Sequence, residues 1–149
     1  FGDLQCSSQV GSILKFKDFS LLCPNEKEAR LALQNRESGL EALSRELIKQ
    51  TRARNLIMKL GSEGFITFQK NHPDNWLRQS FPALTVNPLD VAGAGDSLLS
   101  VMATGMTSSQ NVMCTAAIAA CMSALAVQTM GNKPINVSSL KKMIDKMFL

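Results

Sequence analysis

The sequence predicts an α/β protein in which an open sheet is flanked by helices, and three observations lead to this fold class. Short apolar runs in the first half end at glycine and proline residues, as strands do. Segments with helical periodicity separate and follow these runs. An uncharged, Ala-rich stretch in the second half has the composition of a core helix. Strands that alternate with helices, followed by helices that cover the sheet, are typical of a layered α/β domain.

The first predicted strand is Phe19–Leu22, and Pro24 ends it. A helix is expected from Asn25 to about Gln34. Asn25 and Glu28 have the spacing of a capping box, in which each side chain bonds a backbone N–H near the helix start. The spacing alone fits a purely structural cap as well as a functional pair.

A second helix is expected shortly afterwards, because Ser38 and Glu41 repeat the capping-box spacing. Its predicted apolar face consists of Leu40, Leu43, Leu47 and Ile48.

A β-hairpin is predicted next along the chain. Leu56–Leu60 forms an apolar strand, Gly61–Gly64 has the composition of a tight turn, and Phe65–Phe68 returns as the partner strand. The turn alone would be unremarkable, since glycines are common in hairpin turns.

The remainder of the chain is expected to be mostly helical. A polar loop is predicted at His72–Asn75, and Pro82 and Pro88 interrupt the extended stretch that follows. No internal repeat or linker is visible, so residues 1–149 are expected to form one domain. The three expected helices cover about residues 95–104, 109–127 and 138–147.

Charge is distributed unevenly along the 149 residues. The first 78 residues hold 12 of the 16 Lys and Arg residues and 9 of the 12 Asp and Glu residues, which predicts a solvated first half and a largely interior second half. Basic residues are not interleaved with aromatic ones, because the chain has no Tyr and one Trp. A nucleic-acid partner is therefore not expected.

The four cysteines show no C-x-x-C spacing and the chain has one histidine, so no zinc site is recognisable. This pattern of cysteines favours a protein of the reducing cytoplasm. Cys114 and Cys121 lie in the Ala-rich stretch and are expected to be buried free thiols. That stretch, residues 112–127, is short and rich in Ala rather than Leu, which predicts a core helix and no membrane contact.

A glycine-rich loop is the strongest functional signal. Between Gln79 and Asn132 the only formal charges are Asp90 and Asp96, and they bracket Val91-Ala92-Gly93-Ala94-Gly95. A segment with so few charges is expected to be buried. A buried carboxylate is unfavourable unless another group pairs with it or the protein uses it functionally. A helix that begins here would direct free N–H groups at an anion, which predicts a phosphate site beside one working carboxylate. The alternative is a close-packed turn in which Asp96 only interacts with the helix dipole.

Two predicted turns follow strands of the expected sheet, namely Lys59–Gly64 and Asp90–Ser97. Ligands bind beyond the carboxyl ends of strands in open α/β sheets. We therefore expect both turns to line one crevice.

Four stretches in order resemble the ribokinase-like, or PfkB, carbohydrate kinases. Asp90-x-x-Gly93-Ala94-Gly95-Asp96-Ser97 is similar to the C-terminal signature of that family, and Pro24-Asn25-Glu26-Lys27-Glu28 is similar to its Asn-x-x-Glu motif. Lys59–Gly64 resembles its nucleotide-side glycine turn, and the Ala-rich helix before Gly131 resembles its closing helix. The resemblance covers nearly the whole chain and implies the C-terminal portion of a ribokinase-like, Rossmann-like open sheet. The residues around Pro24–Arg30 and Gly131 are similar to those of heptose-phosphate and other sugar-phosphate kinases.

The resemblance also implies an activity, which is transfer of the γ-phosphoryl group of ATP to a hydroxyl of a sugar or sugar phosphate, with magnesium. Asp96 would be the general base that accepts the hydroxyl proton. The N–H groups of Gly93, Ala94 and Gly95 would form an anion hole for the transferred phosphoryl group. Lys59, Gly61 and Gly64 would bind the nucleotide. Asn25 and Glu28 would organise magnesium and its waters.

This sequence departs from the family pattern in three respects. Val91 and Ala92 follow Asp90 where the family commonly has Thr, so a monovalent cation would depend on backbone carbonyls there. Ala120 stands near a position that often carries Asn. Complete members are longer, and their N-terminal portion supplies most sugar contacts and the lid, so this chain alone is expected to be inactive.

Two other functions remain open on the sequence. A NAD(P)-binding oxidoreductase domain would need a third glycine near a first strand, and Leu98 occupies that spacing here. A non-catalytic, degenerate kinase module is the other alternative, and retention of Asp96 argues against it. Expected partners are a nucleotide and a small sugar substrate, and assembly into a homo-oligomer is left open.

Overall fold

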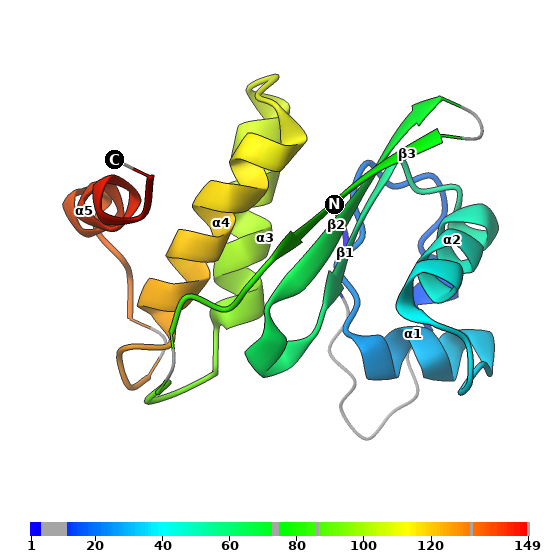
Figure 1. The fold of residues 1–149 in the computed structure, drawn as a ribbon, viewed down its shortest axis with the longest axis horizontal. Helices are drawn as coiled ribbons and strands as arrows, with labels where there is room; N and C mark the ends of the chain where they lie inside the picture. Colours follow the sequence, from blue (N-terminus) through cyan, green and yellow to red (C-terminus); the bar gives the residue numbers. More distant parts are fainter. Residues whose placement is uncertain (4–11, 73–74, 86, 132, 149) are drawn as a thin grey trace. The chain divides into compact units, whose positions relative to one another are not determined.

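The computed structural model describes residues 1–3, 12–72, 75–85, 87–131 and 133–148. The chain forms two compact units, Phe1–Ser80 and Phe81–Leu149, which are described separately. Their elements are labelled in Figure 1. Within the described residues, no helix combines the length and the apolar character that a membrane crossing requires.

An open sheet forms the centre of the first unit, as predicted. The strands β1 (Asn55–Lys59), β2 (Phe65–His72) and β3 (Asn75–Phe81) lie in the order β1-β2-β3. The β1 and β2 strands are antiparallel, with Met58 opposite Ile66, which confirms the predicted hairpin. The predicted polar loop was wrong at its ends, because His72 belongs to β2 and Asn75 to β3, while residues 73–74 lie outside the described residues.

On its other side, β1 is extended by parallel pairing. Leu22 bridges both Gly2 and Leu56, and Asn25 bridges Lys59. Backbone hydrogen bonds follow this ladder, since Leu22 N–H donates to Asn55 O at 3.2 Å and Ile57 N–H to Leu22 O at 2.8 Å. The predicted strand at Phe19–Leu22 therefore pairs through its end, and its pairing continues to Asn25.

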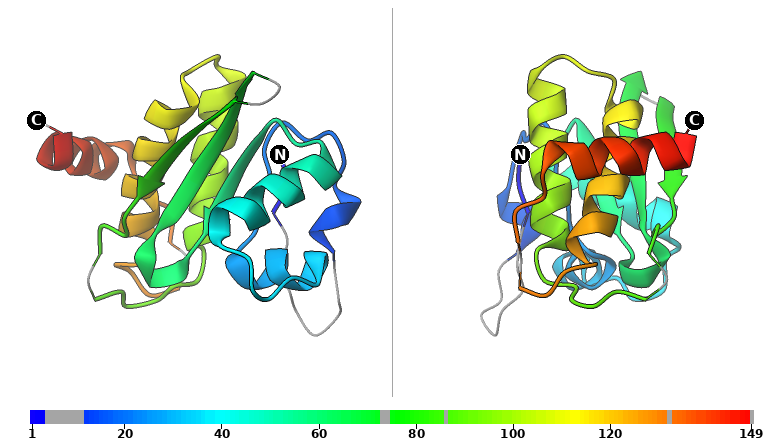
Figure 2. Two further views of the ribbon diagram at one scale, coloured as in Figure 1. Left: turned by 45° about the vertical axis from the view of Figure 1, so that its right-hand side comes forward. Right: turned by 90° about the vertical axis from the view of Figure 1, so that its left-hand side faces the viewer.

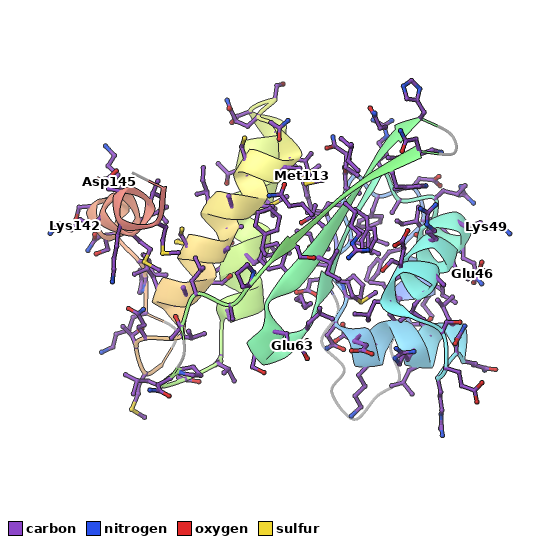
Figure 3. All side chains as sticks on the ribbon, in the orientation of Figure 1. Glu46, Lys49, Glu63, Met113, Lys142 and Asp145 are labelled. Carbon is purple, nitrogen blue, oxygen red and sulfur yellow. The ribbon has the colours of Figure 1, made fainter. Side chains whose placement is uncertain are left out.

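Two helices pack on the same side of this sheet, α1 (Glu26–Leu33) and α2 (Leu40–Thr51), as the ribbons in Figure 2 show. Glu46 and Lys49 point outward from α2 (Figure 3), whereas its predicted apolar face is turned inward. The core cluster joins that face to both strands of the hairpin. Its members include Leu43, Leu47 and Ile48 of α2, Leu56 and Met58 of β1, and Ile66 and Phe68 of β2.

The second predicted capping box was wrong. Gly39 is the N-cap of α2 and has no side-chain cap hydrogen bond. Ser38 Oγ instead accepts a hydrogen bond from Asn35 Nδ2 at 2.9 Å, and the Glu41 carboxylate forms ion pairs with Arg45 and Arg78. The observed N-cap, Gly39, lies one residue after the predicted cap, Ser38, so the box residues are out of register.

The described residues of the second unit form three helices: α3 (Ala94–Thr107), α4 (Val112–Ala126) and α5 (Val137–Phe148). The α3 and α4 helices lie side by side, and α5 packs against α4 (Figure 2). Lys142 and Asp145 point outward from α5 (Figure 3).

Small residues allow α3 and α4 to approach closely. Eight residues of α4 are buried, and most of them are Ala. A Cβ atom added at Gly105 of α3 would lie 2.4 Å from Thr115 Cγ2 of α4. Of the two cysteines expected in this core, Cys121 is buried, whereas Cys114, in the first turn of α4, is exposed.

Candidate active site

The first part of the site lies where the parallel strands of the first unit end. Asn25 is the N-cap of α1, and its Oδ1 accepts the Glu28 N–H at 2.8 Å. The Asn25 N–H donates in return to Glu28 Oε2 at 2.8 Å, so the predicted capping box is confirmed. Glu28 is 4% exposed. The pair therefore has a structural role, and its contribution to a metal site stays a prediction.

Asp3 and Lys59 form an ion pair beside Asn25, and the neutral thiol of Cys23 lies close to it. Lys59 Nζ lies 2.6 Å from Asp3 Oδ1 and 2.7 Å from Oδ2, and the two side chains are 21% and 13% exposed. The pair spans the extended segment that ends in Asn25, because Gly2 and Lys59 pair with opposite edges of that segment. Burial of Cys23, reinforced by the Asp3 charge, raises the pKa of its thiol to about 12, which leaves the thiol protonated and unreactive.

The nucleotide-side turn follows β1 directly. Gly61 has φ +61° and Gly64 has φ +95°, conformations that side chains rarely adopt. The Leu60 N–H donates to Gly64 O at 2.8 Å, and the Gly64 N–H donates to Gly61 O at 3.1 Å. No atom lies within 4 Å of a Cβ built on Gly61, so a ligand could approach its backbone.

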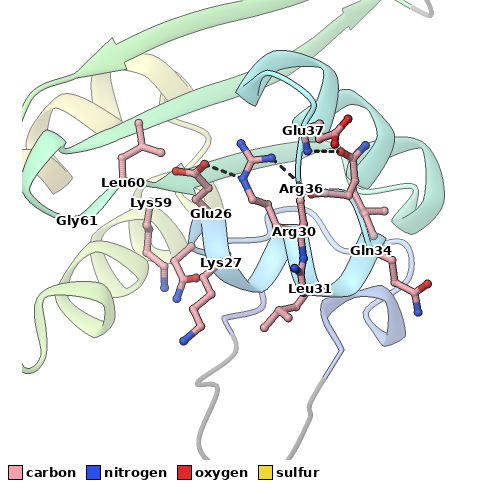
Figure 4. Close-up of a pocket in the computed structure, with 13 residues that line it drawn as sticks. Glu26, Lys27, Arg30, Leu31, Gln34, Arg36, Glu37, Lys59, Leu60 and Gly61 are labelled. Atoms are coloured by element: carbon pink, nitrogen blue, oxygen red, sulfur yellow. Dashed lines mark hydrogen bonds and ion pairs between the residues drawn. The ribbon is translucent and has the colours of Figure 1, made fainter.

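An open cavity of about 1070 Å³ adjoins this turn and extends along α1 (Figure 4). Asn25, Lys59 and Gly61 line it, so the structure brings these three predicted site residues together. Arg30 crosses the cavity wall and is already engaged, since its Nε pairs with Glu26 Oε1 at 2.8 Å and its Nη1 donates to Ser38 O at 3.0 Å. Sequence reasoning missed the cavity, because most of its lining comes from α1 and the turn after it.

Magnesium has few protein ligands available in this region. Among the residues that the structure describes, no group of three His, Cys, Asp or Glu side chains could hold a metal ion. The oxygens of Asn25 and Glu28 are of the type that magnesium prefers, and magnesium commonly keeps waters and binds through one or two carboxylates and substrate phosphates. The donor set therefore fits an ion held mainly by phosphates and water.

The second part of the site is the glycine loop of the second unit. Gly93 is the N-cap of α3, with φ +78°, and it makes no side-chain cap hydrogen bond. Ala94, Gly95 and Asp96 form the first turn of α3, where N–H groups lack intrahelical acceptors. No side chain caps this helix start, and the Ala94 N–H donates only a long hydrogen bond, of 3.4 Å, to Val91 O, so this turn can receive an anion.

Asp96 is exposed, so the expectation of a buried carboxylate was wrong. The reason is helical geometry. Leu98 and Met102 form the buried face of α3, and Asp96 lies on the opposite face with Ser100 and Thr104. The segment lacks charge because its polar surface consists of Ser and Thr. An exposed carboxylate in the first turn of a helix remains accessible to a substrate.

Asp90 ties this loop to the end of α4, a function that sequence reasoning did not anticipate. Its Oδ1 accepts the Ala92 N–H at 2.9 Å, and its Oδ2 accepts the Gly131 N–H at 3.0 Å. These two hydrogen bonds hold the pKa of the Asp90 carboxyl below its ordinary value. Only two features of the sequence hinted at this connection, namely a lone carboxylate, Asp90, before the glycine loop and a glycine, Gly131, after the Ala-rich helix.

The predicted site residues thus fall into two groups, one in each unit. Asn25, Glu28, Lys59, Gly61 and Gly64 gather at one end of the first unit. Gly93–Asp96 lie at the start of α3 in the second unit. The shared crevice stays a prediction.

Comparisons with known proteins place this arrangement in a family. Residues 9–137 match the profile described as pfkB family carbohydrate kinase. The bifunctional protein HldE of Syntrophotalea carbinolica is 29% identical over 129 residues, which cover 85% of this chain and 26% of that protein. This chain therefore spans about a quarter of the length of that curated relative.

Two solved structures share the fold. Ribokinase from Thermotoga maritima superposes with a TM-score of 0.72 at 21% identity, covering 85% of this chain and 42% of that chain. Phosphofructokinase-2 from Escherichia coli in complex with potassium superposes with a TM-score of 0.74 at 16% identity, covering 89% of this chain and 42% of that chain. These likenesses confirm the predicted ribokinase-like α/β fold. Since the family profile also matches the sequence over most of its length, this chain belongs to the pfkB family of carbohydrate kinases.

Proposed function

We propose that residues 1–149 form the nucleotide-binding and catalytic part of a kinase that transfers the γ-phosphoryl group of ATP to a hydroxyl of a sugar or sugar phosphate. The main support for this proposal is the arrangement of residues at the start of α3. There, a helix N-terminus without a side-chain cap follows Gly93, and the exposed Asp96 lies in the same first turn. Family membership favours a kinase over a NAD(P)-dependent oxidoreductase.

In this proposal the second unit carries the chemistry. The N–H groups of Gly93, Ala94 and Gly95 bind the phosphoryl oxygens, because preorganised donors stabilise charge that develops in the transition state. Asp96 orients the acceptor hydroxyl and takes its proton as the hydroxyl oxygen attacks phosphorus. The exposure of Asp96 supports this role, since a base must reach its substrate.

The first unit would bind the nucleotide. Gly61 and Gly64 offer backbone that a ligand can approach, and Lys59 lies beside them with its charge shared with Asp3. Asn25 and Glu28 would orient magnesium and its waters near the phosphates, and the ion neutralises phosphate charge when it is bound. A monovalent cation would rely on backbone carbonyls near Asp90, because both oxygens of that carboxylate already accept N–H bonds.

The proposal is tested in the full-length parent protein with ATP, magnesium and a panel of sugars and sugar phosphates. The parent is expected to release ADP with at least one acceptor. Asp96→Asn should lower kcat by roughly two to four orders of magnitude and leave the KM for ATP little changed. Asp145→Asn is the matched control, because Asp145 is an exposed carboxylate that points outward from α5. The function is refuted if no acceptor supports turnover, and the role of Asp96 is refuted if its Asn variant keeps normal kcat.

A further inference from the structure

The Asp90 carboxylate connects two segments that are distant in sequence. Its Oδ1 bond to the Ala92 N–H, at 2.9 Å, closes a local turn just before Gly93. Its Oδ2 bond to the Gly131 N–H, at 3.0 Å, reaches from the loop before α3 to the segment after α4. One side chain therefore shapes the loop and attaches it to another part of the same unit.

Three further hydrogen bonds join the loop to the last turns of α4. The N–H groups of Leu89 and Asp90 both donate to Val127 O, at 2.8 and 3.3 Å. Ser123 Oγ donates to Ala94 O at 3.2 Å. These bonds lie on both sides of Gly93. Because α4 is packed along α3, the loop is fixed to a rigid element, which is how precise sites are supported.

A cation ligand would be the other use for such a carboxylate. Its neighbours offer no side-chain oxygen, since Val91 and Ala92 follow it. Both of its own oxygens already accept backbone N–H bonds, and these bonds favour the ionised carboxylate without any metal. The contacts are those of a hydrogen-bonded tether.

We infer that Asp90 is a positioning residue for phosphoryl transfer, because its bond to Gly131 fixes the loop that carries the Gly93–Gly95 amides and Asp96. This inference rests on the proposed function. Asp90 acts through the loop and does not contact the substrate. A displacement of about 1 Å at a reacting group can cost roughly 100-fold in rate, so a loosened loop reduces kcat more than nucleotide affinity.

Asp90→Asn in the full-length parent protein tests the bond selectively. The Asn Oδ1 can still accept the Ala92 N–H, but its amide NH₂ faces the Gly131 N–H, and two donors cannot bond. We expect kcat to fall roughly 10- to 100-fold while the KM for ATP stays within about threefold. Hydrogen exchange should accelerate by roughly tenfold at Gly131, because local opening becomes easier.

Ser123→Ala is the companion variant. It removes an independent bond to Ala94 O from a partly buried position and should lower kcat by roughly two- to tenfold with an unchanged circular dichroism spectrum. If Asp90→Asn does not fold, the kcat of Ser123→Ala tests whether the attachment of the loop to α4 matters for turnover.

Three outcomes would overturn the inference. The first is a normal kcat in Asp90→Asn although hydrogen exchange at Gly131 is faster. The second is an unchanged exchange rate at Gly131 in that variant. The third is full recovery of the kcat of Asp90→Asn when the potassium concentration is raised, which would identify Asp90 as a cation ligand. A parent protein that is inactive with every acceptor would instead refute the proposed function. The exchange rate at Gly131 would still decide whether the tether exists.

Discussion

The ion pair between Asp3 and Lys59 should contribute measurably to the stability of the first unit. Exposed ion pairs contribute about 0–1 kcal/mol, whereas breaking a fully buried pair by removing one partner costs about 3–5 kcal/mol. The two side chains are 13% and 21% exposed, and the contact is bidentate. We therefore expect Asp3→Asn or Lys59→Met to lower the free energy of unfolding by about 2 kcal/mol each, because each removes one partner of an ion pair that is largely shielded from water.

A double-mutant cycle isolates the pair. Asp3→Asn combined with Lys59→Met removes both charges of the pair, so the loss should be smaller than the sum of the two single losses by about 1–2 kcal/mol. Urea unfolding followed by the fluorescence of Trp76 is suited to the measurement, since it is the only tryptophan and packs against the core of this unit.

Asp18→Asn is the matched control. Asp18 pairs with Arg52, but their side chains are 62% and 61% exposed, so the urea midpoint should hardly move. Single losses that add fully in the Asp3 and Lys59 cycle would refute the reasoning, because they would show that the two charges do not interact.

Three other outcomes are expected. Gly105→Ala should destabilise the second unit by about 1–3 kcal/mol in thermal unfolding, because the new Cβ overlaps Thr115, and Thr115→Ala in the same chain should restore much of the loss, whereas no recovery would contradict the overlap. Asp90 stabilises the folded state when ionised, because its folded pKa lies below its ordinary value of 3.8. This stabilisation is therefore complete well above that value and is lost as pH falls through the folded pKa. The difference in Tm between the parent and Asp90→Asn should be present at about pH 6 and shrink progressively as the pH is lowered below the ordinary value, and a constant difference would exclude the carboxylate as its source. Residues 1–149 alone should release no ADP in a sugar-dependent manner, since the acceptor must be held in line with the phosphoryl group, and turnover by the purified chain would show that the acceptor site lies within it.

Local patterns were predictable from the sequence, and contacts between distant segments were not. The capping box of Asn25 and Glu28 and the apolar face of α2 depend on residues a few positions apart, and both were confirmed. The same capping-box spacing failed at Ser38, because the helix begins after Gly39 and the spacing carries no information on register. The β3 strand was predicted only as part of an extended stretch, since most of its side chains are exposed and its pattern lacks alternation.

In the candidate site, too, local features were predictable and contacts between distant segments were not. Both glycine turns could be found because Gly61, Gly64 and Gly93 adopt positive φ angles, which favour glycine for local steric reasons. The partner of Lys59 could not be found, because Asp3 reaches it across an intervening segment of the sheet. Exposure of Asp96 was missed because absence of charge was equated with burial, while Ser and Thr provide the polar face of α3.

The capping box has a consequence for the interpretation of genetic data. Asn25 and Glu28 hold the first turn of α1 together, so their replacement lowers the amount of folded protein in a cell as well as any turnover. A screen that scores loss of growth would count both effects as one phenotype. At these two positions, activity must therefore be normalised to protein abundance before a substitution is assigned to catalysis.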